Sequence, residues 1–208
     1  MFNALKEPVY DLRFLLDRNY KKEPAIRIVA DKYRLTKKQR NFLLRAIFSE
    51  KEAEEHRKKL TASARGKDLI VDGYNVLITV ESLLKKKELF LSDDGFVRDV
   101  SATFGKYRIS RTTPKAIEKI LNALKAHRPK SVIFIFDSQV SFSGELCKMF
   151  REKMSEMGIK GDARTSENAD YTIMKSKGIV CTSDRAIIKK VEKVLDLAGH
   201  VTINGPVA

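Results

Sequence analysis

The sequence has few cysteines and no long hydrophobic runs. Only Cys147 and Cys181 occur among its 208 residues, which argues against a disulfide framework or a cysteine-rich zinc site. Both lie in apolar, helix-like or strand-like contexts, where buried reduced thiols of a cytosolic protein are found. No apolar run approaches the length of a membrane span, and the amino terminus lacks the hydrophobic core of a signal peptide. The expected location is therefore cytoplasmic.

Motifs of several enzyme classes are also missing. There is neither a Walker loop nor a Gly-x-Gly-x-x-Gly run, so nothing supports nucleotide binding. His56, His127 and His200 show no mutual spacing that would make a metal or catalytic set, and we treat them as structural. A phosphatase of the haloacid dehalogenase type would need Asp-x-Asp after its first strand, where this chain has Asp72 and Tyr74.

Acidic residues are the minority. The chain has 27 Asp and Glu against 41 Lys and Arg, a formal net charge of +14. The excess is uneven, because residues 1–67 carry 18 Lys and Arg against 9 Asp and Glu, and the remainder carries 23 against 18. Such an excess favours a polyanionic partner, with nucleic acid first. A lysine-rich surface kept for solubility or thermal stability is the alternative.

Residues 1 to about 60 are predicted to be helical. Pro8 and Pro24 suit the first turns of two helices, and Thr36 with Gln39 makes a capping box for a third. The second and third helices have the dimensions of a helix-turn-helix, with basic residues as candidates for nucleic-acid binding. These are Arg34, Lys37, Lys38 and Arg40. A helical hairpin packed on the main domain, with a solvated basic face, is the alternative.

A charged segment at 50–67 looks like a helix tail and a linker, so we expect a helical domain at 1–66 and an α/β domain at 67–208. Beyond it, apolar strand-like runs alternate with helical patterns. Strands are expected near 69–72, 131–136, 159–164, 179–182 and 200–203, and helices near 75–84, 113–126, 143–157 and 169–177, with another helix capped by Ser183. A less regular stretch covers 88–111. This alternation predicts a parallel sheet with helices on both faces.

Three of the expected strands end at an aspartate: Asp72, Asp137 and Asp184. Asp170 begins the helix between the third and fourth strands. If the second and fourth strands flank the first, all four carboxylates converge on one crevice. Clustered like charges raise one another's pKa unless a cation neutralises them, and carboxylate oxygens select Mg²⁺ or Mn²⁺. Such ions activate water and stabilise an in-line displacement at phosphorus.

Each aspartate also has a structural alternative. Asp72 and Asp137 have side chains suited to bonding the turns that follow them. Asp170 and Asp184 are first-turn residues that favour the helix dipole. Arg185 and Lys189, on the helix after Asp184, form either a solvated face or contacts to phosphate.

Four ordered motifs resemble those of PIN-like ribonuclease domains, closest to the NYN branch, over residues 68–203. They are Asp72-Gly73-Tyr74-Asn75, Phe136-Asp137, Asn168-Ala169-Asp170-Tyr171-Thr172-Ile173 and Thr182-Ser183-Asp184. The resemblance implies a five-stranded parallel sheet in the order 3-2-1-4-5, metal-dependent phosphodiester cleavage and an RNA substrate. By position it implies metal-site roles for Asp72, Asp137, Asp170 and Asp184, and second-shell or phosphate-facing roles for Asn75 and Ser183. A helical domain fused before such a fold resembles an uncharacterised prokaryotic family.

The chain departs from this pattern between the first two strands. That segment is longer than expected, and an acid that many PIN domains carry in their early helices has no clear counterpart. Asp93, Asp94, Asp99 or Glu81 is a possible replacement. The loop 92–99, in which Arg98 stands among carboxylates as a candidate nucleic-acid contact, is otherwise a surface turn.

The first functional hypothesis is therefore a Mg²⁺- or Mn²⁺-dependent ribonuclease. The second is a non-catalytic RNA- or DNA-binding protein that uses the same fold, and the incomplete acidic set keeps it open. A homodimer is possible for a PIN-like domain, although no exposed apolar surface in the sequence argues for one.

Overall fold

The computed structural model describes residues 5–99 and 107–203. The described residues divide into two compact units, 5–58 with 88–99, and 59–87 with 107–203. An all-helical region thus comes first in the chain and an α/β fold follows, which confirms the predicted fold class. Within the described residues, no helix is long and apolar enough to cross a membrane.

The first unit consists of helices and one short hairpin. Its elements are α1 (Lys6–Asp17), α2 (Lys22–Lys32), α3 (Lys37–Ala46), most of α4 (Glu50–Lys59), β2 (Leu89–Leu91) and β3 (Val97–Asp99). The predicted capping box opens α3, since the Gln39 N–H donates to the Thr36 hydroxyl and the Thr36 N–H donates to the Gln39 side chain. From the sequence, the hairpin segment was expected to be irregular and to belong to the second domain. It groups with the helices because buried Phe90 packs edge-on against Phe42, with ring centroids 5.1 Å apart.

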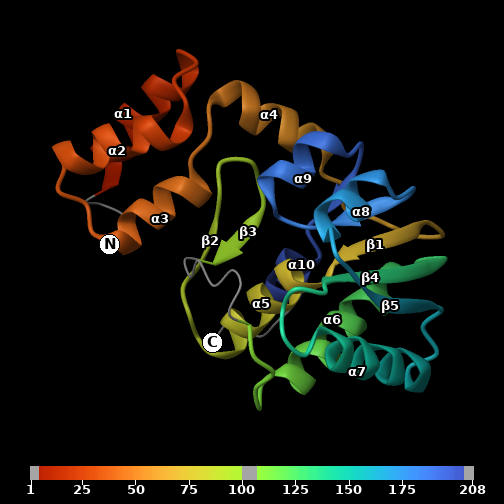
Figure 1. The fold of residues 1–208 in the computed structure, drawn as a ribbon. Coiled ribbons are helices and arrows are strands. Elements are labelled where there is room, and N and C mark those ends of the chain that lie inside the picture. Colours follow the sequence, from red (N-terminus) through yellow and green to blue (C-terminus); the bar gives the residue numbers. More distant parts are fainter. Residues whose placement is uncertain (1–4, 100–106, 204–208) are drawn as a thin grey trace. The chain divides into compact units, whose positions relative to one another are not determined.

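The second unit is built on a five-stranded sheet (Figure 1). Its strands are β1 (Asp68–Asp72), β4 (Ser131–Asp137), β5 (Gly161–Ser166), β6 (Ile179–Cys181) and β7 (Val194–Leu195). Every neighbouring pair is parallel, and the spatial order is β5-β4-β1-β6-β7. In chain order this is 3-2-1-4-5, as expected, and it puts the first strand at the centre of the sheet.

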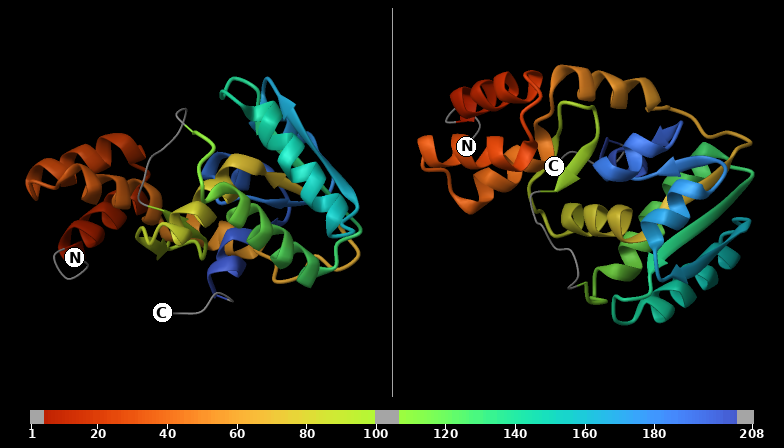
Figure 2. Two further views of the ribbon diagram at one scale, coloured as in Figure 1. Left: turned by 90° about the horizontal axis from the view of Figure 1, so that it is seen from below. Right: turned by 45° about the horizontal axis from the view of Figure 1, so that its top comes forward.

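Helices cover both faces of this sheet (Figures 1 and 2). They are α5 (Gly73–Leu84), α6 (Thr113–His127), α7 (Ser143–Glu156), α8 (Ala169–Lys175), α9 (Arg185–Lys190) and α10 (Leu197–Ile203). One apolar core joins Leu69 and Val71 of β1 to α5, α6, α7 and α10. Successive strand residues alternate in direction, so the intervening Ile70 faces the opposite side, where α8 packs on β1 and buries Ile173.

Two predictions near the carboxyl terminus were wrong. Residues 200–203 belong to helix α10 and not to a strand, because the carboxylate of Asp196 accepts from the Gly199 N–H at 2.9 Å and starts a helix there. The fifth strand is the two-residue β7, which is too short to show a period of two. Asp184, not Ser183, caps α9, and β5 begins two residues later than expected.

Candidate active site

Three of the four candidate aspartates lie at the carboxyl edge of the sheet. Asp72 ends β1, where it pairs in register with Ile135 of β4, and Asp137 ends β4 two residues further on. Asp184 follows β6 and caps α9. Asp170 lies in the first turn of α8, which follows β5. The topology therefore brings together loops that are separated by up to about a hundred residues of chain, as the sequence analysis required.

Asp72 is held by two hydrogen bonds. The Thr182 hydroxyl donates to its Oδ2 at 2.8 Å, and the Asn75 N–H donates to its Oδ1 at 3.3 Å, which makes Asp72 the N-cap of α5. The pKa of Asp72 is raised to about 7, chiefly by burial and also by the charges of Asp184 and Asp170, and the two hydrogen bonds oppose this rise. The carboxyl group is thus held in a place where its negative charge is costly.

The other aspartates share this electrostatic environment. The pKa of Asp170 is raised by burial and then by the charges of Asp184 and Asp137. Asp184 accepts from the Ala186 and Ile187 N–H groups of α9 at 2.7 and 3.2 Å, and Asp137 accepts from the Gln139 N–H at 2.8 Å. The charge of Asp170 raises the pKa of Asp72, and the charges of Asp184 and Asp137 raise the pKa of Asp170. The four carboxylates therefore form one interacting set.

Asn75 and Ser183 bond to each other across this edge. The Asn75 Oδ1 accepts from the Ser183 N–H at 2.8 Å and from the Ser183 hydroxyl at 3.0 Å. This fastens the loop after β6 to the first turn of α5. Both residues are therefore placed where they position the loops that carry Asp72 and Asp184.

Thr182 is a site residue that the sequence analysis quoted in a motif but did not single out. Its hydroxyl donates to Asp72 and accepts from the Asp184 N–H at 3.0 Å, so it links the two aspartates. The signal for Thr182 in the sequence is a hydroxyl residue two positions before an aspartate that follows a predicted strand.

A cavity of about 930 Å³ lies next to the turn that follows Asp137 at the end of β4. It is lined in part by Gln139, whose N–H bonds Asp137, and by Phe142 and Arg108. Phe142 is 64% exposed. It holds a left-handed backbone conformation, with φ of 66°, that is uncommon for a bulky residue. An exposed aromatic ring and a guanidinium thus line this cavity, together with the side chain of Glu145.

The carboxylates considered as replacements for the missing acid have other partners. Glu81, buried on α5, accepts from the Tyr107 hydroxyl at 2.9 Å and from Lys85 at 2.7 Å. Asp93 and Asp99 lie in the first unit and pair with Arg13 and Arg45 there.

Asp94 and Arg98 form a buried ion pair in the same hairpin. Both guanidinium nitrogens of Arg98 bond Asp94, at 2.6 and 2.8 Å, and His56 contacts the same carboxylate at 2.8 Å. Burial opposes ionisation of Asp94, but His56 and Arg98 hold its pKa well below the usual range. Arg98 is 3% exposed, so the structure does not place it on a surface open to nucleic acid.

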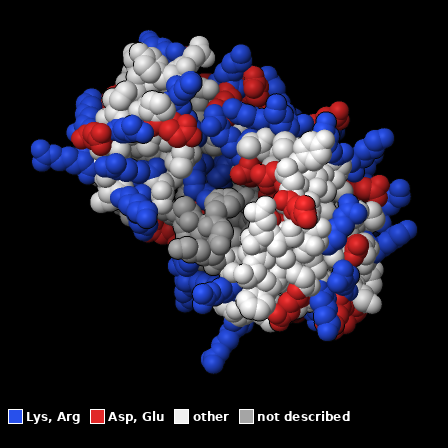
Figure 3. Space-filling model, viewed as in Figure 1, with Lys and Arg blue, Asp and Glu red and all other residues white. Residues whose placement is uncertain are grey.

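The remaining basic candidates occupy both units. Lys189 is exposed at the end of α9 and Arg185 is partly buried at its start. In the first unit all the candidates are exposed; Lys38 pairs with Glu88 at 2.9 Å and Arg40 with Asp31 at 3.6 Å, while Arg34 and Lys37 have no carboxylate within 4 Å among the described residues. Figure 3 shows Lys and Arg side chains over much of one face, with smaller groups of Asp and Glu among them.

Across residues 5–99 and 107–203, no group of three or more His, Cys, Asp or Glu side chains is arranged to enclose a metal ion. Mg²⁺ commonly keeps several water ligands and is held by one or two carboxylates with substrate phosphates. The carboxylates of Asp72, Asp137, Asp170 and Asp184 carry the oxygen donors that Mg²⁺ and Mn²⁺ prefer, so these side chains fit such an ion by donor chemistry, although among the described residues they do not form a group that could hold it by themselves.

Comparison with known proteins shows the family. Residues 61–200 match the family described as "Domain of unknown function (DUF5616)", and residues 4–59 match "Protein of unknown function (DUF434)". The chain is 41% identical over 198 residues to an uncharacterized protein of Methanocaldococcus jannaschii, covering 93% of this chain and 94% of the relative. No solved structure matches. The chain therefore belongs to the DUF5616 family, with a DUF434 region before it.

Proposed function

We propose that this protein is a metal-dependent ribonuclease of the PIN-like class, which hydrolyses RNA at the carboxyl edge of its sheet. The observation that carries the proposal is the electrostatic coupling of Asp72, Asp137, Asp170 and Asp184, which come from four separate loops of one fold. Carboxylates gathered at the ligand-binding edge of an α/β sheet, two of them (Asp72 and Asp170) with a raised pKa, are typical of an active site.

The negative charge of Asp72 is energetically costly unless a bound cation neutralises it. A carboxyl whose pKa is near 7 carries its charge at a cost of about 1.4 kcal/mol for each unit of upward shift. A divalent cation held by these aspartates offsets that cost; when bound, it activates water and stabilises charge on the phosphate. Asp72 and Asp184 are the first candidates to hold it, because the charge of Asp184 helps to raise the pKa of Asp72.

The chain's own hydrogen bonds orient the site. Thr182 and the Asn75 N–H fix both oxygens of Asp72, and the first N–H groups of α9 fix one oxygen of Asp184. A rigid set of carboxylates needs little rearrangement on binding the ion and substrate. This preorganisation supports a catalytic use of the site.

The cavity next to the turn after Asp137 is suited to a single-stranded substrate. Aromatic rings stack on bases of any sequence, and basic side chains follow the phosphate backbone. Exposed Phe142 and Arg108 supply one of each in a space of about 930 Å³. RNA is preferred to DNA on the PIN-like resemblance, and DNA remains an arm of the test.

The proposal is tested with a labelled single-stranded RNA, a matched DNA and Mn²⁺. We expect the wild type to cleave RNA, EDTA to abolish cleavage, and Asp72→Asn and Asp184→Asn each to reduce the rate about a hundredfold or more. Glu118→Gln, an acid-to-amide change on the exposed face of α6, is the matched control and keeps wild-type activity. Equal cleavage by wild type and Asp72→Asn would refute the site. Salt-sensitive RNA binding with no turnover in any metal would refute the nuclease and favour the non-catalytic binding protein.

A further inference from the structure

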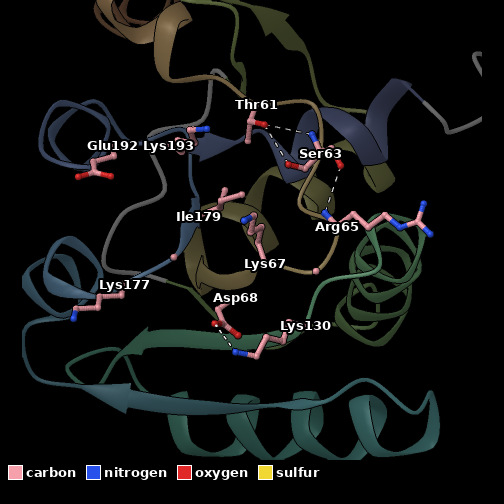
Figure 4. Close-up of a pocket in the computed structure, with 12 residues that line it drawn as sticks. Thr61, Ser63, Arg65, Lys67, Asp68, Lys130, Lys177, Ile179, Glu192 and Lys193 are labelled. Carbon is pink, nitrogen blue, oxygen red and sulfur yellow. Dashed lines mark hydrogen bonds and ion pairs between the residues drawn. The ribbon is translucent and has the colours of Figure 1, made fainter.

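A second polar cavity lies at the opposite, amino-terminal edge of the same sheet (Figure 4). Its volume is about 700 Å³. The segment 61–68 that leads into β1 forms one wall, and the residues just before β4, β6 and β7 form the others. All of these segments belong to the second unit.

The charge of this cavity is strongly positive. Five basic side chains line it against two acids, Asp68 and Glu192. The basic residues are Arg65, Lys67, Lys130, Lys177 and Lys193. Asp68 is already engaged, since the Ser131 hydroxyl donates to it at 2.7 Å and Lys130 lies 3.5 Å away. The Ser131 hydrogen bond lowers the pKa of Asp68 against the effect of burial, and Lys130 lowers it further.

The other four basic groups lack acidic partners. Among residues 5–99 and 107–203, no carboxylate lies within 4 Å of the side-chain nitrogens of Arg65, Lys67, Lys177 or Lys193. Figure 4 shows Lys67 beside Ile179 in the middle of the cavity, with Thr61 and Ser63 on one wall and Lys193 above, whereas Arg65 and Lys177 point away on opposite sides. Cations gathered in a concave site repel one another and attract an anion.

The walls of the cavity are fixed by the backbone. The Thr61 N–H donates to the Val194 carbonyl at 2.8 Å, and the Lys130 N–H donates to the Lys67 carbonyl at 2.8 Å. Gly178 has a φ of +136°, and a Cβ there would lie 2.5 Å from the Asp68 carbonyl oxygen, so only glycine permits this close approach. The lysines therefore extend from a frame that is already in place.

We propose that this cavity binds a phosphate-bearing anion. Lys67 and Lys193 supply ammonium donors, and the Ser63 hydroxyl lies on the same wall. The Thr61 hydroxyl beside it donates to the Ser63 carbonyl at 3.2 Å. Ammonium and hydroxyl groups together match the several acceptor oxygens of a phosphate. The site is separate from the aspartates: from Asp68 to Asp72 the strand β1 advances four residues, roughly 13 Å at about 3.3 Å for each. It does not depend on the nuclease proposal.

Two sources of phosphate share this chemistry, a small free anion and a nucleic-acid backbone. The probes are therefore inorganic pyrophosphate and a single-stranded 12-mer RNA, titrated calorimetrically into the full chain. The test variant is Lys67→Ala with Lys193→Ala. The matched control is Lys115→Ala with Lys125→Ala, which removes two exposed lysines from α6 of the same unit.

We expect the wild type and the control to bind at least one probe, and the test variant to bind that probe about tenfold or more weakly. If RNA is the ligand, the test variant also lowers the slope of log affinity against log salt by about 1.4, the value for two lost phosphate contacts on a single strand. If the test variant binds pyrophosphate more weakly than the wild type does but binds RNA equally well, the ligand of the cavity is a small anion.

Two results would overturn the anion site. One is that neither probe binds the wild type, and the other is that the test variant and the control bind equally well. Asp72→Asn separates this inference from the proposed nuclease, because it disables the aspartate site and leaves pocket-dependent binding unchanged. Circular dichroism of each variant checks that the fold is retained.

Discussion

The Asn75 side chain accepts two hydrogen bonds from Ser183, one from its N–H at 2.8 Å and one from its hydroxyl at 3.0 Å. The two residues are 108 positions apart in the chain. Asn75 follows Asp72 by three residues and Ser183 directly precedes Asp184. This contact therefore connects the segment that carries Asp72 to the segment that carries Asp184.

Asn75→Ala is expected to loosen both loops. It leaves the N–H and hydroxyl of Ser183, which is 3% exposed, without the Asn75 acceptor, at a cost of about 1–3 kcal/mol in the free energy of unfolding. Urea denaturation measures this loss. Asn122→Ala, at an exposed position on α6, should cost much less. Equal stabilities of the two variants would show that the contact between Asn75 and Ser183 does not stabilise the fold.

Asp72 is expected to make folding stability depend on pH. Its folded pKa of about 7 lies above the unfolded value of about 3.9, so the folded state binds more protons between these two values. The contribution of Asp72 to stability is therefore full below about pH 4 and is lost as the pH rises to about 7. The loss amounts to a few kcal/mol. Denaturation of wild type and Asp72→Asn at pH 4, 5.5 and 7 checks it.

The sign of that comparison is specific. Relative to Asp72→Asn, the wild type should lose stability as the pH rises, and Mn²⁺ at pH 7.5 should restore it by mass action, about 2.7 kcal/mol at a hundred times the dissociation constant. Glu118→Gln controls for a change of net charge. Parallel pH profiles for wild type and Asp72→Asn would contradict the raised pKa.

Much of the α/β unit was predictable because its signals are local. The strands β1, β4 and β6 are apolar runs that stop at polar residues, and the alternation of strands with helices predicted a parallel sheet. The order of the strands was expected from the resemblance to PIN-like domains. Asp72, Asp137 and Asp184 were found in the same way. Asp170 was expected beside them because it begins the helix between the third and fourth strands, and the folded structure adds that burial is the main cause of its raised pKa.

Features that depend on tertiary contacts were missed. Residues 200–203 contain three consecutive β-branched residues, which suggest a strand, but the cap at Asp196 makes them helical. Arg98 was assigned to nucleic acid because sequence cannot show that Asp94 and His56 bury it. The hairpin that carries it has three-residue strands, which are too short for a reliable period.

Arg98→Met is expected to destabilise the first unit. It leaves the Asp94 carboxylate buried with His56 and Ser92 but without its guanidinium partner, at a cost of about 3–5 kcal/mol. Thermal denaturation measures the change, and Arg27→Met on the exposed face of α2 is the control. If Arg98→Met keeps wild-type stability but binds RNA more weakly, Arg98 contacts nucleic acid as the sequence predicted.

Phe142→Ala is expected to weaken binding of single-stranded RNA. Loss of one base-stacking platform costs about 1–3 kcal/mol, measured by fluorescence anisotropy in the Asp72→Asn background so that no substrate is consumed. Tyr10→Ala is the matched control, since Tyr10 is 66% exposed and Phe142 is 64% exposed. An unchanged affinity in the Phe142 variant would exclude the cavity next to the turn after Asp137 as the path of the strand.

The most direct measurement is anomalous diffraction from a crystal soaked in Mn²⁺. We predict a manganese peak next to Asp72 and Asp184 in the wild type, and its loss in Asp72→Asn. Absence of a peak near all four aspartates, in crystals soaked well above neutral pH with a phosphodiester analogue present, would contradict the metal site and the nuclease proposal with it.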